Sequence, residues 1–364
     1  MPSSQKECID LTESGITEDA NYSSPSNVPL RRSTRARRQT EPFTIEVSQQ
    51  RESKQAQSQQ RLEQVPYQTA EQLGLEASVV PFVRVHPVAL AMITFHAHLT
   101  KTEIIGYLAG FETEVDNKKE ILIAEAFPAK QVKPSDLAKT GRSAFTEVEA
   151  LPESTIEIAA RVSAKGMRVV GWYHSHPDET FTTEPSRVDI ENQRNYQHLV
   201  YKDEPFVAAI IAPYNEDLPD HRPDVEFFRV WAEECALKLS YEVCYNGLVQ
   251  YLRATTVGNG GEISFPLDSF MGECYDLITE YSSFGRRVRL DKNWRADVLG
   301  VDKLKRALCD LVAEFDCEQV ALYRSAVDAI VEAVDKAWKE SAFRELERRR
   351  ENAARKRRKR RRGA

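Results

Sequence analysis

The sequence predicts an α/β fold, in which a mixed β-sheet is flanked by helices and followed by a helical C-terminal region. Between residues 79 and 232, apolar stretches of strand length alternate with stretches whose apolar residues recur at helical spacing. Beyond residue 232, the helical spacing continues alone. With 364 residues, 41% of them apolar, the chain is long enough for one or two ordinary domains with buried cores.

Residues 1–78 are predicted to be a disordered N-terminal region. They are rich in Ser, Gln, Glu, Thr and Arg, and their aromatic residues are Tyr22, Phe43 and Tyr67. So little apolar surface cannot offset the entropy that a chain loses when it becomes ordered. We therefore expect order to begin near Val80.

The first predicted element of the domain at 79–232 is a helix that starts at Pro87. Proline suits the first helical position, and apolar residues follow at helical spacing up to Leu99. The elements expected after it are strands at Glu103–Phe111 and Glu120–Phe127, a helix at Pro152–Ala164, and strands at Met167–His176, Pro205–Ala212 and Pro223–Trp231.

Residues 233–343 are predicted to form the helical C-terminal region, which leads into a basic tail at 344–364. The expected helices are Glu233–Leu252, Leu267–Tyr281, Val301–Phe315 and Glu318–Glu351. The tail has twelve Lys or Arg residues against three Glu, so it carries +9 while the rest of the chain carries −15. Its last basic run, Arg355–Arg362, is expected to stay solvated because like charges repel.

Two histidines and an aspartate form a predicted zinc site. His174 and His176 occupy positions i and i+2 of a predicted strand, so both rings project from the same face. The helix that follows has Ser186 as its expected N-cap and Asp189 in its first turn. Two histidines and one carboxylate would leave the fourth position of the metal to water, as in catalytic zinc sites. The sequence therefore predicts one Zn2+ ion held by His174, His176 and Asp189.

A pair of histidines at this spacing is more often structural than metal-binding, so the surrounding element decides the interpretation. His96 and His98 have the same spacing but fall on the predicted helix after Pro87, where positions i and i+2 diverge. We predict structural or surface roles for both, and likewise for His86, His198 and His221.

Hydrolysis at a zinc site also needs a general base that is not itself a ligand. Glu103 is the candidate because it opens an otherwise apolar strand, where a carboxylate is costly without a partner or a purpose. The alternative is a charge at a strand end that simply reaches solvent.

These motifs resemble the JAMM/MPN metalloprotease family over about residues 80–232. The matching stretches are Thr102–Gly110, Gly171–Pro177, Ser186 and Asp189. The resemblance extends to the branch that contains the Myb-, SWIRM- and MPN-domain histone deubiquitinase and the MPN-domain-containing proteins, through Phe95–Glu103, Asp189–Gln193 and Tyr196–Gln197.

The resemblance implies a role for each residue of the predicted site. It implies that His174, His176 and Asp189 bind zinc, that Glu103 is the general acid and base, and that Ser186 helps to stabilise the oxyanion. Many family members lack these residues and act as scaffolds. Because this sequence has all five residues, the resemblance predicts an enzyme.

One spacing departs from the family motif. Twelve residues separate His176 from Asp189, where the motif has ten. Because the pattern Ser-x-x-Asp is intact, the extra residues must lie at 178–184 and lengthen the loop beside the site. Asp189 stays the predicted ligand, with Asp178 or Glu184 as the alternative.

The predicted function is that of a JAMM-type zinc isopeptidase, a deubiquitinase that removes ubiquitin or a ubiquitin-like modifier from a nuclear, chromatin-associated substrate such as a histone. The alternative is a non-catalytic MPN scaffold subunit of a chromatin or ubiquitin-pathway complex, and an MPN-domain partner subunit is a further expectation. A zinc nucleoside deaminase is excluded because the chain lacks the PCxxC ligand pair.

Several segments indicate location and partners. Arg355–Arg362 and a basic cluster at 31–38 suit nuclear import or contact with nucleic-acid phosphates. Cys8–Glu13 resembles a SUMO-interacting motif, with contact expected through Ile9–Leu11.

The six cysteines form no CxxC pair and no secretory signal is evident, so we expect an intracellular protein with reduced thiols. No apolar run approaches the roughly 20 residues that span a bilayer, so no membrane contact is expected.

Overall fold

The computed structural model describes residues 63–76, 78–115, 118–139, 148–178, 182–202, 204–232, 234–244, 267–313 and 318–362. The basic cluster at 31–38, the Ile9–Leu11 motif and most of the region predicted to be disordered lie outside these residues.

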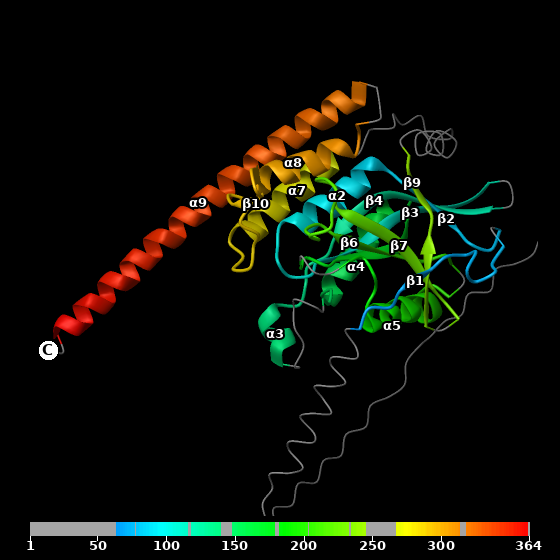
Figure 1. Ribbon diagram of the computed structural model, residues 1–364, viewed down its shortest axis with the longest axis horizontal. Coiled ribbons are helices and arrows are strands. Elements are labelled where there is room, and N and C mark those ends of the chain that lie inside the picture. The colour runs from blue at the N-terminus through cyan, green and yellow to red at the C-terminus, as the bar shows by residue number, and fades with distance from the viewer. Residues whose placement is uncertain are drawn as a thin grey trace, which may run out of the picture. The chain divides into compact units, whose positions relative to one another are not determined.

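The predicted mixed sheet with flanking helices is confirmed. Among the described residues, nine strands form one sheet in the order β1-β8-β7-β6-β5-β3-β4-β2-β9. Figure 1 shows this sheet together with its helices. Parallel pairs are β1–β8, β5–β6, β2–β4 and β2–β9, and the other neighbours are antiparallel. The strands are Tyr67–Gln68 (β1), Phe82–Val85 (β2), Ile105–Val115 (β3), Lys118–Pro128 (β4), Arg168–Ser175 (β5), Val207–Ala212 (β6), Asp224–Trp231 (β7), Cys235–Leu239 (β8) and Tyr241–Val243 (β9).

The helices flank this sheet and continue beyond it. They are Pro87–His98 (α2), Pro134–Lys139 (α3), Pro152–Ala164 (α4), Arg187–Asn195 (α5), the π-helix Tyr196–Val200 (η1), Leu267–Ser282 (α7), Gly300–Asp310 (α8) and Glu318–Arg362 (α9). A small antiparallel pair, Asn293–Arg295 (β10) with Val298–Leu299 (β11), precedes α8. In the part of the chain that the structure describes, no helix is long and apolar enough to cross a bilayer.

Each face of the sheet carries its own apolar core. On one face, α2 is buried along its whole length, because it is apolar all round and contacts β4, α7 and α8. The C-terminal helices α7, α8 and α9 complete this core. On the other face, Ile158 of α4 and Ile190 of α5 pack in one cluster with Ile105 and Trp172. The second face carries the predicted site.

The central pair of strands, β3 and β5, is packed closely. Ile105 lies opposite His174 and Gly106 lies opposite Tyr173. A Cβ atom at Gly106 would come within 2.3 Å of the Tyr173 ring, so no larger residue fits there without a shift. This register fixes which residues of β3 stand beside the predicted ligands of β5.

The helix predicted at Glu233–Leu252 is wrong in its first half, because residues 235–239 and 241–243 form the strands β8 and β9, while residues 245–252 lie outside the described residues. Ala236, Leu237 and Leu239 are buried, and β8 pairs antiparallel with β7 while β9 pairs with β2. A short apolar run is compatible with the residue spacing of a helix and with that of a strand. Here the neighbouring strands supplied the backbone hydrogen-bond partners, so the segment is extended.

Order also extends further than predicted at both ends of the chain. The expected start near Val80 is wrong, since the described chain begins at residue 63 and β1 pairs with β8. The C-terminal helix α9 continues to Arg362 instead of ending near Glu351. Arginine and lysine are good helix formers, and adding residues to an existing helix costs little, so the basic run continues the helix.

Helix α8 contributes a buried lysine at its contact with α2. Lys303 Nζ lies 2.9 Å from His98 Nε2, 3.1 Å from the carbonyl oxygen of His221 and 4.7 Å from the centre of the Trp294 ring. His98 Nδ1 lies 2.7 Å from the carbonyl oxygen of Thr94, which can only accept, so Nε2 is the nitrogen that accepts from Lys303. Burial lowers the pKa of Lys303 to about 7.

Candidate metal centre

The end of β5, with the residue that follows it, places two imidazoles on the face that α5 covers. His174 is 1% exposed and His176 is also buried. The His174 ring stacks on Trp172, with centroids 4.8 Å apart and planes 12° apart. Trp172 is itself fixed, because its Nε1 donates to Gln193 Oε1 at 2.8 Å. The strand and this stack together restrict how the His174 ring can turn.

The third residue, Asp189, is held by the N-terminus of α5. Ser186 caps this helix, and its hydroxyl accepts from Asp189 N at 3.3 Å. In return, Asp189 Oδ2 accepts from Ser186 N at 2.8 Å and from Ser186 Oγ at 2.7 Å, which completes a capping box. Asp189 Oδ1 is left to face His174 Nε2 at 3.2 Å.

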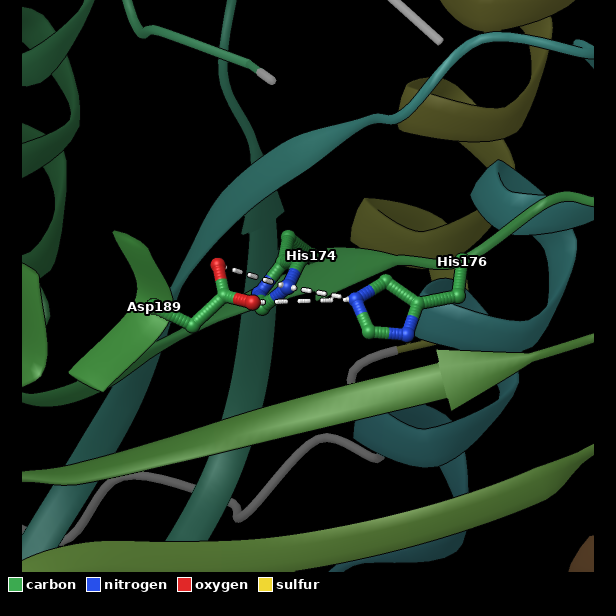
Figure 2. A group of neighbouring side chains, drawn as sticks. All are labelled: His174, His176 and Asp189. Carbon is green, nitrogen blue, oxygen red and sulfur yellow. Dashed lines mark hydrogen bonds and ion pairs between the residues drawn. The ribbon is translucent and has the colours of Figure 1, made fainter. Parts of the chain in front are cut away.

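The three side chains converge on one point (Figure 2). His174 Nε2 lies 3.2 Å from His176 Nε2, and His176 Nε2 lies 3.8 Å from Asp189 Oδ2. For zinc bonds of about 2.0–2.1 Å in a tetrahedron, ligand atoms stand roughly 3.3 Å apart. Two of the spacings, both 3.2 Å, are close to this value and the third is 3.8 Å, and two nitrogens with a carboxylate are a donor set that zinc accepts.

Hydrogen bonds set the protonation state that a metal ligand needs. His176 Nδ1 lies 2.7 Å from the carbonyl oxygen of Thr182, which can only accept, so Nδ1 carries a proton and Nε2 is the nitrogen that faces His174 and Asp189. Burial alone would raise the pKa of Asp189, but contacts with His174 and His176 bring that pKa well below its ordinary value. The carboxylate is therefore ionised at neutral pH.

Glu103 lies beside these residues, although two positions before β3 and not within a strand as predicted. Ser175 N donates to the carbonyl oxygen of Ile104 at 3.2 Å, and Ile104 N donates to Ser175 Oγ at 3.1 Å. Continuing the register of β3 and β5 by two residues sets Glu103 opposite His176. Glu103 is 6% exposed, so it is a buried carboxylate next to the site and not a charge that reaches solvent.

The comparisons with known proteins agree with this geometry. Residues 78–202 match the family described as JAB1/Mov34/MPN/PAD-1 ubiquitin protease. The chain contains an MPN domain. It is similar to the histone deubiquitinase MYSM1 of Xenopus laevis, with 30% identity over 61% of this chain and 24% of that one.

Two further relatives support the same assignment. The deubiquitinase MYSM1 of Homo sapiens is 33% identical over 47% of this chain and 19% of its own. An MPN domain-containing protein of Mus musculus is 27% identical over 63% of this chain and 43% of its own. The chain thus spans less than half of the length of these relatives.

The structure brings together His174, His176 and Asp189 and places Ser186 and Glu103 beside them, while their roles stay predictions. Among the described residues, Asp178 and Glu184 join no group of metal-ligating side chains. The Ser186 hydroxyl is engaged with Asp189, so its observed contact is with the proposed ligand.

The other histidines lie apart from the metal centre of the MPN domain. His96 is buried, with its ring nitrogens 3.0 Å from Tyr173 Oη and 3.1 Å from Tyr281 Oη. His98 meets Lys303, His86 caps α2, and His198 is on the surface. Structural and surface roles for these residues match the prediction.

Sequence reasoning missed two supports of the candidate metal centre, the carbonyl of Thr182 and the pair Trp172–Gln193. A backbone carbonyl carries no signal in the sequence. The contact of Trp172 with His174 could have been predicted. Trp172 lies two residues before His174 on the same strand, and the alternation of side chains along a strand places both rings on one face.

Proposed function

We propose that this chain is a zinc-dependent isopeptidase that removes ubiquitin, or a ubiquitin-like modifier, from a nuclear protein. The observation that carries the proposal is the convergence of His174, His176 and Asp189, next to the buried carboxylate of Glu103, within an MPN domain. Relatives named as deubiquitinases support the reaction class, and the name of one of them suggests a histone as the substrate.

The chain's residues divide the reaction between them. When bound, zinc would lower the pKa of water and polarise the carbonyl of the isopeptide. Glu103 accepts a proton from the attacking water and returns it to the lysine amine as the C–N bond breaks, so the products are a carboxylate and a free lysine. Ser186 would donate to the oxyanion once its hydroxyl turns from Asp189.

Residues outside the site support the proposed location. Beyond Ser341, the described residues of α9 are exposed or half-exposed, and the helix carries the basic run Arg355–Arg362 (Figure 1). Such a helix suits nuclear import and contact with nucleic-acid phosphates, as chromatin would offer. Contact with SUMO through Ile9–Leu11 and a partner MPN subunit remain predictions.

A cleavage assay tests the proposal. The purified chain is incubated with a panel of di-ubiquitins and with ubiquitinated nucleosomes, with and without a zinc chelator, and His174→Ala is the matched control. We expect cleavage of at least one substrate that the chelator and the substitution both abolish. Absence of cleavage together with absence of bound zinc would favour the scaffold alternative.

A further inference from the structure

We propose that residues 63–68, here called the strap, position the ligands of the metal centre, with Tyr67 as the main positioning residue. The inference rests on the proposed zinc site. The strap lies before residue 78, where the match to the MPN family model begins.

The backbone of the strap runs along the loop that leads into α5. Arg187 N donates to the carbonyl oxygen of Glu63 at 3.2 Å, and Val65 N donates to that of Pro185 at 2.7 Å. Between these two bonds, Gln64 and Ser186 form an antiparallel bridge. The strap therefore holds the residue that caps α5 and binds Asp189.

The other end of the strap is fixed to the sheet. Tyr67 and Gln68 form β1, which pairs with Ala236 and Leu237 of β8. The Tyr67 ring also packs 5.9 Å from the ring of Phe228. Because one end joins the sheet and the other joins the loop, the strap ties the loop to a rigid element.

Tyr67 reaches the same loop with its side chain. Its hydroxyl donates to the carbonyl oxygen of Thr183 at 2.7 Å, and the neighbouring carbonyl of Thr182 accepts from His176 Nδ1 at 2.7 Å. The Thr183 hydroxyl donates to Asp224 Oδ2 at 3.1 Å, which fixes that residue on its other side. Burial, with Glu226 and other nearby carboxylates, raises the pKa of Tyr67 well above its ordinary value, so the phenol stays a donor at neutral pH.

The strap stabilises the lengthened loop between His176 and Asp189. With twelve residues between His176 and Asp189, the segment that carries both Thr182 and Ser186 has more conformations to lose when it becomes ordered. The strap offsets this loss because it binds residues 183, 185, 186 and 187 in turn. It thereby acts on His176 through Thr182 and on Asp189 through Ser186.

The test measures metal binding directly and does not depend on activity. Tyr67→Phe removes one hydroxyl, and Val65→Pro removes one backbone donor while keeping an apolar residue. The matched control is Tyr323→Phe, because Tyr323, which is buried where Tyr67 is half-buried, also donates to a backbone carbonyl, that of Leu308, at 2.9 Å. Zinc affinity is measured by competition with a chromophoric chelator, and the visible spectrum of the cobalt-substituted protein reports the coordination geometry.

We expect Tyr67→Phe and Val65→Pro to weaken zinc binding by roughly 10-fold, the lower end for residues that orient metal ligands, and to change the cobalt spectrum. Tyr323→Phe should change neither. If both strap variants bind zinc as tightly as the wild type with an unchanged spectrum, the strap inference is overturned and the proposed function stands. A folded wild type that binds neither metal overturns the proposed function and the strap's role with it.

Discussion

Replacing Ser186 by alanine should weaken zinc binding by about 10- to 100-fold and leave the domain folded. The hydroxyl of Ser186 makes two contacts with Asp189, one to its carboxylate at 2.7 Å and one from its backbone N–H at 3.3 Å. Alanine removes both, so of the contacts that residue 186 makes with the Asp189 carboxylate, the hydrogen bond from its backbone N–H remains.

The same contacts give the expected effect on stability. Loss of a serine N-cap costs about 1 kcal/mol, and loss of a hydrogen bond to a charged group costs about 1.5–3 kcal/mol. Because one hydroxyl makes both contacts, the two costs overlap, and we expect the free energy of unfolding of the metal-free protein to fall by about 2 kcal/mol.

Chelator competition and urea denaturation of the same preparations give the two quantities. Ser154→Ala is the matched control, since Ser154 is buried and accepts from Lys130 N at 3.0 Å near the start of α4, away from the metal centre. The control should lose stability and keep its zinc affinity. Unchanged zinc affinity in Ser186→Ala would refute the reasoning that the cap orients the ligand.

Three further predictions concern the base, the buried lysine and the tail. Glu103→Gln keeps the size of the side chain but cannot accept the proton, so zinc should remain bound while cleavage falls by roughly 10²-fold or more; full activity would mean that another residue is the base. Lys303 has a pKa of about 7 when folded, against 10.5 as the ordinary value, so above pH 7 the unfolded chain binds more protons. The unfolding free energy of the wild type, relative to Lys303→Met, should therefore rise by about 2 kcal/mol from pH 7 to pH 9, and parallel pH curves in denaturant titrations would contradict this. Deleting residues 355–362 together with the cluster at 31–38 should move a fluorescent fusion out of the nucleus without changing cleavage in vitro, and unchanged nuclear fluorescence would count against the assignment.

The convergence of His174, His176 and Asp189 could be predicted from sequence because local rules decide it. The alternation of a strand sets His174 and His176 on one face, and the capping pattern sets Ser186 and Asp189 in one helical turn. Neither rule depends on distant parts of the chain. The strand and the helix then needed only the packing of α5 against the second core to bring the three side chains together.

The supports of these three residues could not be predicted because they depend on contacts between distant segments. Tyr67 meets Thr183 across 116 residues of chain, through a carbonyl that every residue possesses. The strand β8 has too few residues for its period to be distinguished from that of a helix, and its pairing with β7 and β1 decided its conformation. Contacts of this kind become visible when the tertiary structure is known.

The zinc content of the wild-type chain, purified without chelators and measured by inductively coupled plasma mass spectrometry, tests the central claim most directly. The account predicts about one zinc ion per chain, lost in His174→Ala and in His176→Ala because two remaining protein ligands hold the ion poorly. A folded wild-type chain without zinc would contradict it and would leave the MPN domain as a non-catalytic scaffold.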